Sequence, residues 1–433
     1  MNYGCTSHSV AYSSELAPIQ NLSKLTMGLQ ADPRFSKIKS EICALITHWC
    51  QEASNGHSVR LPDARLTKLL RKEVQGRGCL AATEDVDLRI QEDAQILPGL
   101  LDACVPFPPP VKPEFTFIDL FAGIGGFRLA AQNEGGKCVF SSEWNEAAQQ
   151  TYLKNYGELP FGDIRQFTNK EISDTVLQKC IPKHDVLCAG FPCQPFSHAG
   201  VSARQSLGRS HGFDCATQGT LFFDLIRIAK ALKPKVLILE NVRNLMNHDK
   251  GNTFKIIRET IEKDLKYSFF PMLVDARTMV PQKRVRCFMV CFRDTSIEFD
   301  FPNFGGEPKL LKSILEPSKR VESYTISDRM WAGHQRRTIR NIARGAGFTT
   351  YAASLDAPSN TIVARYWKDG KECLVPQKGK NPRTLTPREC ARLQGFPEEF
   401  IIPERKKDAY MQFGNSVVVP VVERIVNKVK SHL

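Results

Sequence analysis

The sequence predicts an α/β protein whose core is a doubly wound sheet. Short apolar runs of strand length alternate with segments of helical length between residues 115 and 294. The first run, residues 115–120, leads directly into a glycine turn and a helical segment, the order found at the ligand-binding start of such sheets. Two later runs are each followed by an acidic residue, Glu143 and Glu240. These observations predict a ligand site at the carboxyl ends of the strands.

Composition predicts a soluble protein with a polyanionic partner. The 433 residues are 42% hydrophobic and 24% charged, and no apolar run approaches membrane-spanning length. The polar N-terminus lacks the apolar core of a signal peptide, so we expect a cytoplasmic protein with no membrane association. The 14 cysteines follow no zinc-ligand spacing, so no metal is expected. The net charge of +13 favours nucleic acid as the partner.

The first 111 residues form an N-terminal extension that the sequence predicts to be helical. Apolar residues recur at helical spacing between residues 35 and 49, and more weakly between residues 66 and 74. The proline-rich run at residues 105–110 indicates a stiff linker and a domain boundary. Two short helices are compatible with a DNA-binding helix-turn-helix, although packing or a scaffold role is the commoner use of so weak a pattern.

The glycine turn and the second strand favour an adenosine ligand without a pyrophosphate. The turn, at residues 121–126, has neither Gly-x-Gly-x-x-Gly spacing nor a following Gly-Lys-Ser/Thr. Glu143 lies about 20 positions beyond it, where dinucleotide-binding folds place the carboxylate that binds ribose hydroxyls. The neighbouring Trp144 is suited to stacking on an adenine face. S-adenosylmethionine fits this pattern; the alternative is a solvated Glu143 and a core Trp144.

The residues around Cys193 predict a nucleophile at the end of a strand. The apolar run at residues 185–189 ends in a loop in which Pro192 and Pro195 bracket Cys193 and restrict the backbone around it. A thiol held in this way suits nucleophilic catalysis, whereas the alternative is a core cysteine. Residues 194–219 form a long polar loop with several basic groups, which suits phosphate contacts and a lid, or else a disordered surface insertion.

Two further strands are expected to bring charged groups to the same edge. Residues 235–239 predict a buried strand, and Glu240 follows it, near Cys193 if the two strands are neighbours. A continuous strand from Gln282 would project Gln282, Arg284 and Arg286 from one face, and the alternative is a solvated basic edge. Helices are expected over residues 220–232 and 253–265, with a strand over residues 268–274 between them and Gln282.

The regular alternation of predicted strands and helices ends after residue 294. Residues 295–380 have many turns and predict a small, mostly irregular domain that contains β-structure. A capping box then predicts a helix, with Thr386 as N-cap, Pro387 at its first position, Glu389 at its third and Gly395 after its end. An apolar helix is expected from Val417 to the C-terminus.

From about residue 115 onward, the chain resembles the bacterial C5-cytosine DNA methyltransferases of restriction–modification systems. It has the motifs of that family in order: DLFAGIGG, SEW, GDI, GFPCQPFS, GTLFFD, ENV, QKRVR, LTPRECARLQGFP and QFGNSVVVPV. The resemblance implies a Rossmann-like, S-adenosylmethionine-dependent catalytic domain over residues 112–294, completed by residues 412–433. It also implies a target-recognition domain and hinge helix over residues 295–411. The N-terminal extension lies outside it.

The resemblance also implies the chemistry. Position 5 of cytosine is a poor nucleophile, so Cys193 would add to position 6 of a base flipped out of the duplex. Protonated Glu240 would assist at N3, and Arg286 would contact O2 with Arg284 and Gln282 in support. The residues implied for S-adenosylmethionine are Phe121, Gly123, Gly125, Gly126, Glu143, Trp144, Asp163, Ile164, Leu221, Asn415 and Ser416.

Sequence choice is expected to depend on residues 359–370, which resemble the recognition stretch of enzymes that read CCWGG or CCNGG. Arg365 suits a bidentate contact to guanine, Thr361 a hydroxyl or methyl contact, and Lys368 a phosphate. The alternative is that Tyr366 and Trp367 fill the core of the small domain and that Arg365 pairs with a carboxylate. Further DNA contacts are expected from residues of the long loop: Ser197, Arg204 and Arg209.

Two rival functions follow from the same residues. One branch of this family methylates cytosine in tRNA, but its Cys-Phe-Thr signature is not found here. A DNA-binding regulator that acts through the N-terminal extension is the second rival, alone or beside catalysis. We expect a bacterial enzyme that acts on double-stranded DNA as a monomer and protects it from a cognate restriction enzyme.

Overall fold

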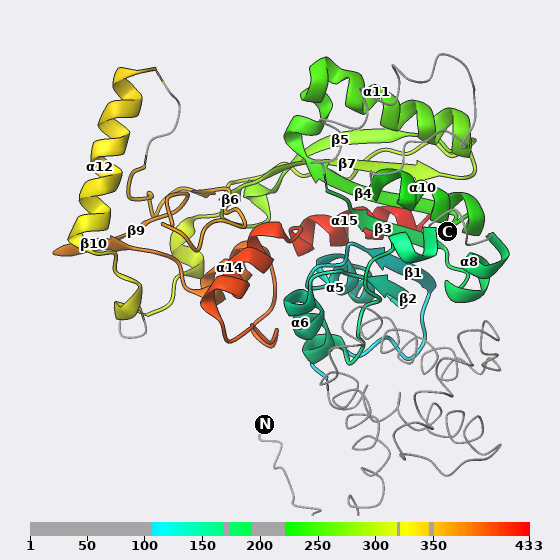
Figure 1. Ribbon diagram of the computed structural model, residues 1–433, viewed down its shortest axis with the longest axis horizontal. Coiled ribbons are helices and arrows are strands. Elements are labelled where there is room, and N and C mark those ends of the chain that lie inside the picture. The colour runs from blue at the N-terminus through cyan, green and yellow to red at the C-terminus, as the bar shows by residue number, and fades with distance from the viewer. Residues whose placement is uncertain (1–104, 169–173, 193–220, 318–320, 346–349) are drawn as a thin grey trace, which may run out of the picture.

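A mixed six-stranded sheet forms the core of the larger of two regions (Figure 1). The computed structural model describes residues 105–168, 174–192, 221–317, 321–345 and 350–433. The strand order is β2-β1-β3-β4-β7-β5, and β7 runs antiparallel to both of its neighbours. The strands are β1 (Phe115–Leu120), β2 (Gly136–Ser142), β3 (Val186–Gly190), β4 (Val236–Val242), β5 (Phe270–Asp275) and β7 (Val285–Phe292).

Helices cover both faces of this sheet, because successive side chains along each strand point to opposite faces. In β1, Phe117 belongs to one buried apolar cluster and Ile118 to the other. The first face is covered by α5 (Gly126–Asn133), α6 (Glu146–Tyr156) and α15 (Val419–Lys430). The second is covered by α8 (Asp174–Cys180), α10 (Leu221–Leu232) and α11 (Asn252–Glu259). This confirms the predicted doubly wound α/β fold. Shorter helical segments of the region include α7 (Arg165–Thr168), η3 (Arg243–Gly251) and η5 (Ala276–Thr278).

Two of the expected elements differ from the sequence-based prediction. The helix expected over residues 253–265 is α11 followed by a π-helical turn, Thr260–Leu265. The continuous strand expected from Gln282 is broken at Arg284, so that β6 (Gln282–Lys283) is separate from β7. The break has a physical reason, because β6 leaves the large sheet and pairs with β8 (Ser359–Asn360) of the smaller region.

The smaller region contains a helix that the sequence analysis missed. Residues 295–380 were expected to be mostly irregular, yet α12 (Asp328–Ala343) spans 16 residues. Its two buried side chains are His334 and Thr338, so the helix lacks the apolar periodicity by which such elements are recognised. Besides α12 and β8, the smaller region contains η6 (Leu311–Ile314), η8 (Glu322–Tyr324), β9 (Val375–Gln377) and β10 (Lys380–Arg383).

The C-terminal elements join the two regions. The predicted capping box of α13 (Pro387–Leu393) is confirmed, with the Thr386 hydroxyl accepting from Glu389 N and the Glu389 carboxylate accepting from Thr386 N. Gly395 has a φ of 77° and lies against Pro420, where a Cβ atom would come within 2.3 Å of the proline ring. After α14 (Lys406–Asn415), helix α15 returns to the large region and packs on α5, where Asn133 Nδ2 donates to Glu423 Oε1.

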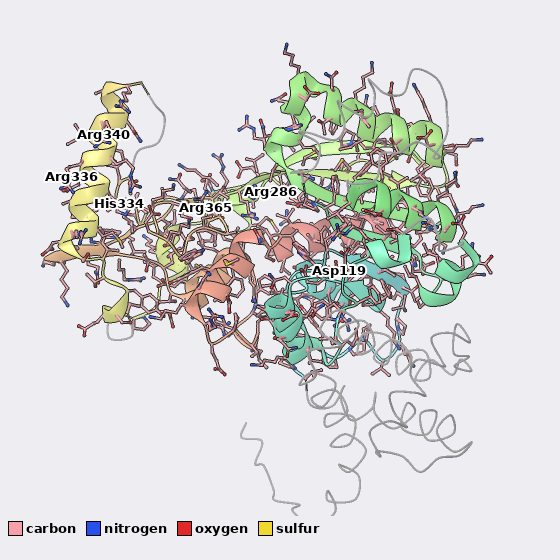
Figure 2. The ribbon with its side chains drawn as sticks, viewed as in Figure 1. Asp119, Arg286, His334, Arg336, Arg340 and Arg365 are labelled. Atoms are coloured by element: carbon pink, nitrogen blue, oxygen red, sulfur yellow. The ribbon has the colours of Figure 1, made fainter. Side chains whose placement is uncertain are left out.

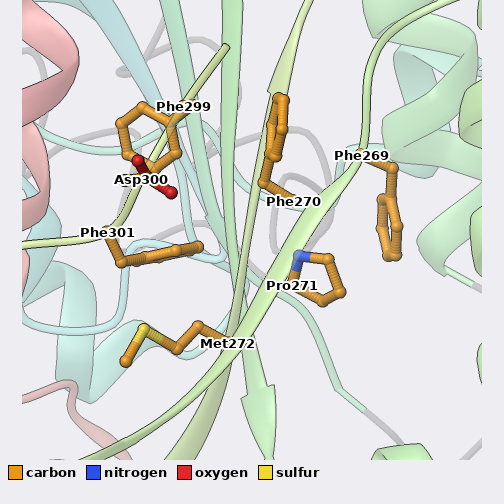
Figure 3. A pocket seen from close by; sticks show the side chains of 7 residues that line it. All are labelled: Phe269, Phe270, Pro271, Met272, Phe299, Asp300 and Phe301. Atoms are coloured by element: carbon orange, nitrogen blue, oxygen red, sulfur yellow. The ribbon is translucent and has the colours of Figure 1, made fainter.

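The edge strand β5 borders a hollow lined mainly by aromatic side chains (Figure 3). It contains none of the residues that the sequence assigns to a site, so the candidate site is built from the strand ends instead. The residues that line this hollow are Phe269, Phe270, Pro271, Met272, Phe299, Asp300 and Phe301.

Within the described ranges, no helix is both long and apolar enough to cross a membrane.

Candidate active site

The glycine turn after β1 is shaped by a tyrosine from α6. Gly125 has a φ of 80°, and its carbonyl accepts a hydrogen bond of 2.8 Å from the Tyr156 hydroxyl. A Cβ atom on Gly125 would come within 2.4 Å of the Tyr156 ring, so a larger residue would push the turn out of place. Phe121 and Gly123 also have positive φ values, 58° and 57°. The turn at the carboxyl end of β1 therefore depends on glycine at position 125.

The Glu143 side chain is bound to this turn by hydrogen bonds from backbone N–H groups. Its carboxylate accepts from Gly123 N and from Asn145 N, both at 2.8 Å. The residue is only 9% exposed, and burial raises the pKa of its carboxyl group although the backbone hydrogen bonds oppose this. The structure thus brings two of the predicted cofactor residues, Gly123 and Glu143, into direct contact.

Trp144, which directly follows Glu143, is 75% exposed. Ser142 Oγ donates to Gly162 O at 2.8 Å, which holds the ends of these two segments together next to Asp163 and Ile164. Ile164 is buried, whereas the Asp163 carboxylate accepts hydrogen bonds from Arg165. Burial acts to raise the pKa of Asp163, but the hydrogen bonds from Arg165 outweigh it and lower the pKa.

Of the remaining predicted cofactor residues, Ser416 lies next to the turn. A Cβ atom on Gly126 would lie 2.9 Å from Ser416 Oγ, so the C-terminal segment closes one side of the turn. Phe121 and Leu221 both pack, half-buried, against the same apolar cluster. Asn415 is exposed at the end of α14.

Asp119, which the sequence analysis did not assign to a site, is completely buried in β1 (Figure 2). Neither of its carboxylate oxygens has a hydrogen-bond partner among the described residues. Burial raises the pKa of Asp119 to about 8, with Arg128 opposing the rise. Burial therefore favours the neutral form of this carboxyl group.

Glu240 and Arg286 form an ion pair at the carboxyl end of β4. Their Oε1 and Nε atoms are 3.1 Å apart. In the parallel pairing of β3 with β4, Gly190 lies opposite Glu240, so this carboxylate is adjacent to the strand that leads into Cys193. Burial raises the pKa of Glu240, while the charges of Arg286 and Arg284 oppose the rise. Burial also lowers the pKa of Arg286.

Asn241 is a positioning residue that the sequence analysis passed over. It is 2% exposed, and its Nδ2 atom donates to the carbonyl of Phe191 at 2.8 Å. This bond ties the end of β4 to the chain two residues before Cys193. The signal was present, because Asn241 directly follows Glu240 in the ENV motif.

Gln282, Arg284 and Arg286 do not form the single row that a continuous strand would give. Arg286 reaches Glu240, whereas Gln282 and Arg284 are buried and bond to backbone carbonyl groups. Burial lowers the pKa of Arg284 to about 9, the charge of Arg286 adds to this effect and Glu240 opposes it. The acceptors are Leu393 O for Gln282 and Ile362 O, Gly414 O and Ser416 O for Arg284.

The candidate DNA-contact residues differ in what the structure describes. Arg365 is exposed, and its guanidinium forms no ion pair within the described ranges. Thr361 Oγ1 donates to Lys283 O at 2.6 Å, while Lys368 is exposed beside Trp367. Tyr366 is buried, as the alternative interpretation expected, whereas Trp367 is 39% exposed. Four predicted site residues lie outside the described residues: Cys193, Ser197, Arg204 and Arg209.

Comparison with known proteins decides the family. The profile of the C-5 cytosine-specific DNA methylases matches residues 115–431, which is most of the chain. The chain belongs to this family. A C-5 cytosine-specific DNA methylase transfers a methyl group to position 5 of cytosine in DNA, as the ordered motifs led us to expect.

Two curated relatives show how far the similarity extends. Type II methyltransferase M.SsoII of Shigella sonnei is 46% identical over 336 residues, which cover 76% of this chain and 83% of the relative. Type II methyltransferase M1.ScrFI of Lactococcus lactis subsp. cremoris is 42% identical over 387 residues, covering 86% of this chain and 94% of the relative. The second match leaves 14% of this methylase uncovered, less than the 26% that residues 1–111 represent (111 of 433). That match therefore extends into part of the extension, whereas the family profile begins at residue 115 and leaves the extension outside, as expected.

Solved structures agree on the fold. The crystal structure of S. pombe Dnmt2 methyltransferase has a TM-score of 0.54 at 17% identity and covers 72% of this methylase and 97% of that chain. An Entamoeba histolytica methyltransferase, EhMeth, has a TM-score of 0.55 at 19% identity, with 73% and 98% covered. These similarities support the Rossmann-like fold. The description of the family, C-5 cytosine-specific DNA methylase, names DNA and not tRNA as the substrate.

We expect Trp144→Ala to weaken binding of S-adenosylmethionine by this methylase. Loss of a stacked aromatic contact should cost on the order of 1–3 kcal/mol, by analogy with base–aromatic stacking. Calorimetric titration with S-adenosylmethionine measures this loss, and DNA affinity should change much less. Trp367→Ala is the matched control, because it removes a partly exposed tryptophan from the smaller region. Equal cofactor affinity in wild type and Trp144→Ala would refute the stacking role.

Proposed function

We propose that the protein uses S-adenosylmethionine to methylate a flipped-out cytosine within a specific duplex site. We further propose that it acts in the cytoplasm of a bacterium, where it protects DNA from a cognate restriction enzyme. The observation that carries this proposal is the Glu240–Arg286 pair. It lies at the strand end opposite Gly190, at the same edge of the sheet as the glycine turn. One edge would thus serve both the cytosine and the methyl donor.

The proposed chemistry assigns one step to each group. The Cys193 thiolate forms a bond to position 6 of the cytosine, and Glu240 delivers a proton to N3, where negative charge would otherwise accumulate. Burial, which raises the pKa of Glu240, supports its protonated form. Arg286 stabilises O2. The activated position 5 takes the methyl group, and loss of its remaining proton expels Cys193.

The residues around the glycine turn fit S-adenosylmethionine, which supplies the methyl group when bound. Exposed Trp144 would offer one face to the adenine, and the apolar side chain of Ile164 would cover the other. The Glu143 carboxylate, already oriented by Gly123 N, would bind the ribose hydroxyls. Backbone groups of the turn and the Ser416 hydroxyl would hold the methionine part. Phe121, Leu221, Asp163 and Asn415 would complete the pocket.

We assign residues 112–294 with residues 412–433 to a catalytic domain, and residues 295–411 to a target-recognition domain with its hinge helix. The packing of α15 on α5 supports the first assignment, because it joins the C-terminal helix to the large sheet. The Arg284 bonds to the C-terminal segment support a close connection between the domains. A monomer on DNA, and a regulatory role of residues 1–111, stay predictions.

Incubation with labelled S-adenosylmethionine and unmethylated DNA tests the proposed function. Label should enter DNA as 5-methylcytosine, and bisulfite mapping should find it at one short sequence. Transfer of label to tRNA but not to DNA would overturn the proposal. Protection of the mapped site against a restriction enzyme that cuts there tests the biological role.

We propose that Arg365 reads guanine in a CCWGG or CCNGG site. Its exposed guanidinium, with no ion pair to a described residue, supports this role. Arg365→Ala should remove the discrimination of about 1–3 kcal/mol that one bidentate contact gives at one base pair, so that recognition there is relaxed or lost. Lys368→Ala is the matched control: it should weaken binding to all sequences equally and reduce the salt dependence. Methylation of unchanged sites at unchanged relative rates by Arg365→Ala would exclude the assignment.

A further inference from the structure

Helix α12 carries three arginines in one exposed row. Arg329, Arg336 and Arg340 are spaced seven and four residues apart, so that 3.6 residues per turn place them within about 40° of one another around the helix axis. All three are exposed. Figure 2 labels two of them, Arg336 and Arg340, on this helix. They define what we refer to as the arginine row.

The opposite face of α12 fixes the direction of this row. His334 and Thr338 are 1% and 5% exposed and pack against the rest of the smaller region. His334 Nε2 lies 3.1 Å from Asp369 O, and Thr338 Oγ1 accepts from Thr350 N at 2.8 Å. The helix also has a firm start, because the Ser327 side chain accepts from Met330 N. The arginine row therefore faces outward from a rigid element.

The charge of the arginine row is not neutralised within the described part of the chain. None of its three guanidinium groups forms an ion pair there, in contrast to Arg337, whose Nη1 is 3.2 Å from Asp369 Oδ2. Asp328, the one acidic residue of α12, is bonded to Asn381 at the first turn. Ile339, about 60° from Arg336 around the helix axis, is 69% exposed. Positive charge combined with exposed apolar surface is expected where a partner covers the helix.

We propose that the arginine row of α12 binds the sugar–phosphate backbone of the target DNA outside the base pairs that are read. The inference rests on the proposed function, and DNA matches both the charge of the row and the substrate of the family. Along the axis the arginines are about 10 Å and about 6 Å apart, suitable for separate phosphates. Because α12 stands at the end of the molecule farthest from the six-stranded sheet, these contacts would lengthen the DNA footprint (Figure 1).

The test is the salt dependence of DNA binding by a triple variant, R329Q/R336Q/R340Q. Each lost phosphate contact should reduce the slope of log K against log salt by about 0.9, giving a fall of about 2.7 for three contacts. Affinity should drop on every sequence alike, while the rate at saturating DNA and the mapped target site should not change. The single variants R336Q and R340Q should each reduce the slope by about 0.9, which preserves the test if the triple variant unfolds.

A matched control removes three lysines from the amino edge of the sheet. Lys183, Lys233 and Lys266 are exposed and precede β3, β4 and β5, so they lie opposite the candidate active site. Their triple glutamine variant should keep the wild-type slope. If the wild type is active but the α12 variants keep its salt slope, the inference about the arginine row is overturned and the proposed function is not. A wild type that neither binds nor methylates DNA would overturn the proposed function instead. If the α12 variants lose self-association while the slope of log K against log salt stays unchanged, the row binds a second protein chain, and this result would also overturn the inference.

Discussion

Cys193→Ala should abolish methyl transfer while leaving DNA affinity largely intact. The thiolate is the one group proposed to form a bond to the base, and position 5 stays a poor nucleophile without that bond. Alanine removes a sulfur atom but no charge that holds DNA in the ground state. Rates measured with labelled S-adenosylmethionine, together with binding by gel shift, separate these two effects. Appreciable turnover by Cys193→Ala would sink the assignment.

A trapping experiment on the wild type completes this prediction. With 5-fluorocytosine at the target position, no proton can leave position 5 after methyl transfer, so the enzyme should stay covalently attached to the DNA. The adduct should survive denaturing electrophoresis, and Cys193→Ala should form none. A stable adduct formed by Cys193→Ala would mean that another residue is the nucleophile.

Glu240→Gln should lower kcat by about 10²–10⁴-fold, the usual contribution of a positioned proton donor. The amide keeps the shape of the side chain but has no carboxyl proton to deliver to N3. Burial, the largest cause, raises the pKa of Glu240, so the protonated form persists to higher pH than for an exposed glutamate. The wild-type kcat should therefore fall as pH rises through this raised pKa, and the variant should lose that limb of the profile.

Glu389→Gln is the matched control for Glu240→Gln. Glu389 is also buried and pairs with an arginine, Arg383, with 2.7 Å between Oε1 and Nη2. Removing one partner of a buried ion pair costs about 3–5 kcal/mol of folding free energy, so both variants should unfold at a lower temperature than the wild type. Only Glu240→Gln should lose the pH-dependent limb. A parallel loss in both variants would show that the rate effect of Glu240→Gln comes from stability.

The parts of the fold that follow local rules could be predicted from the sequence. Residues 115–120 form the expected strand, because an apolar run followed by a glycine turn has few alternative structures. The Thr386 capping box was equally secure, since it needs only residues within one helical turn. Helix α12 could not be predicted by periodicity, because its buried face is formed by His334 and Thr338 rather than by apolar residues.

The same limit applies to the candidate site. Glu143 and Glu240 were found because each follows a strand that the sequence marks clearly. The separate roles of Arg284 and Arg286 were not predictable, because they depend on β6 leaving the sheet. Its residue Gln282 pairs with Ser359, 77 positions later in the chain. A pairing rule of period two is valid only within one unbroken strand.

The return of α15 to α5 has a consequence for how the chain is made. Asn133 and Glu423, which bond across these helices, are 290 positions apart in the chain. During synthesis, the apolar face of α5 has no partner until Val419–Lys430 have left the ribosome. Contacts of such separation slow folding and leave apolar surface exposed in the meantime. A released chain that stops before Val419 would lack this cover, so premature termination should give an aggregating product and no partially active enzyme.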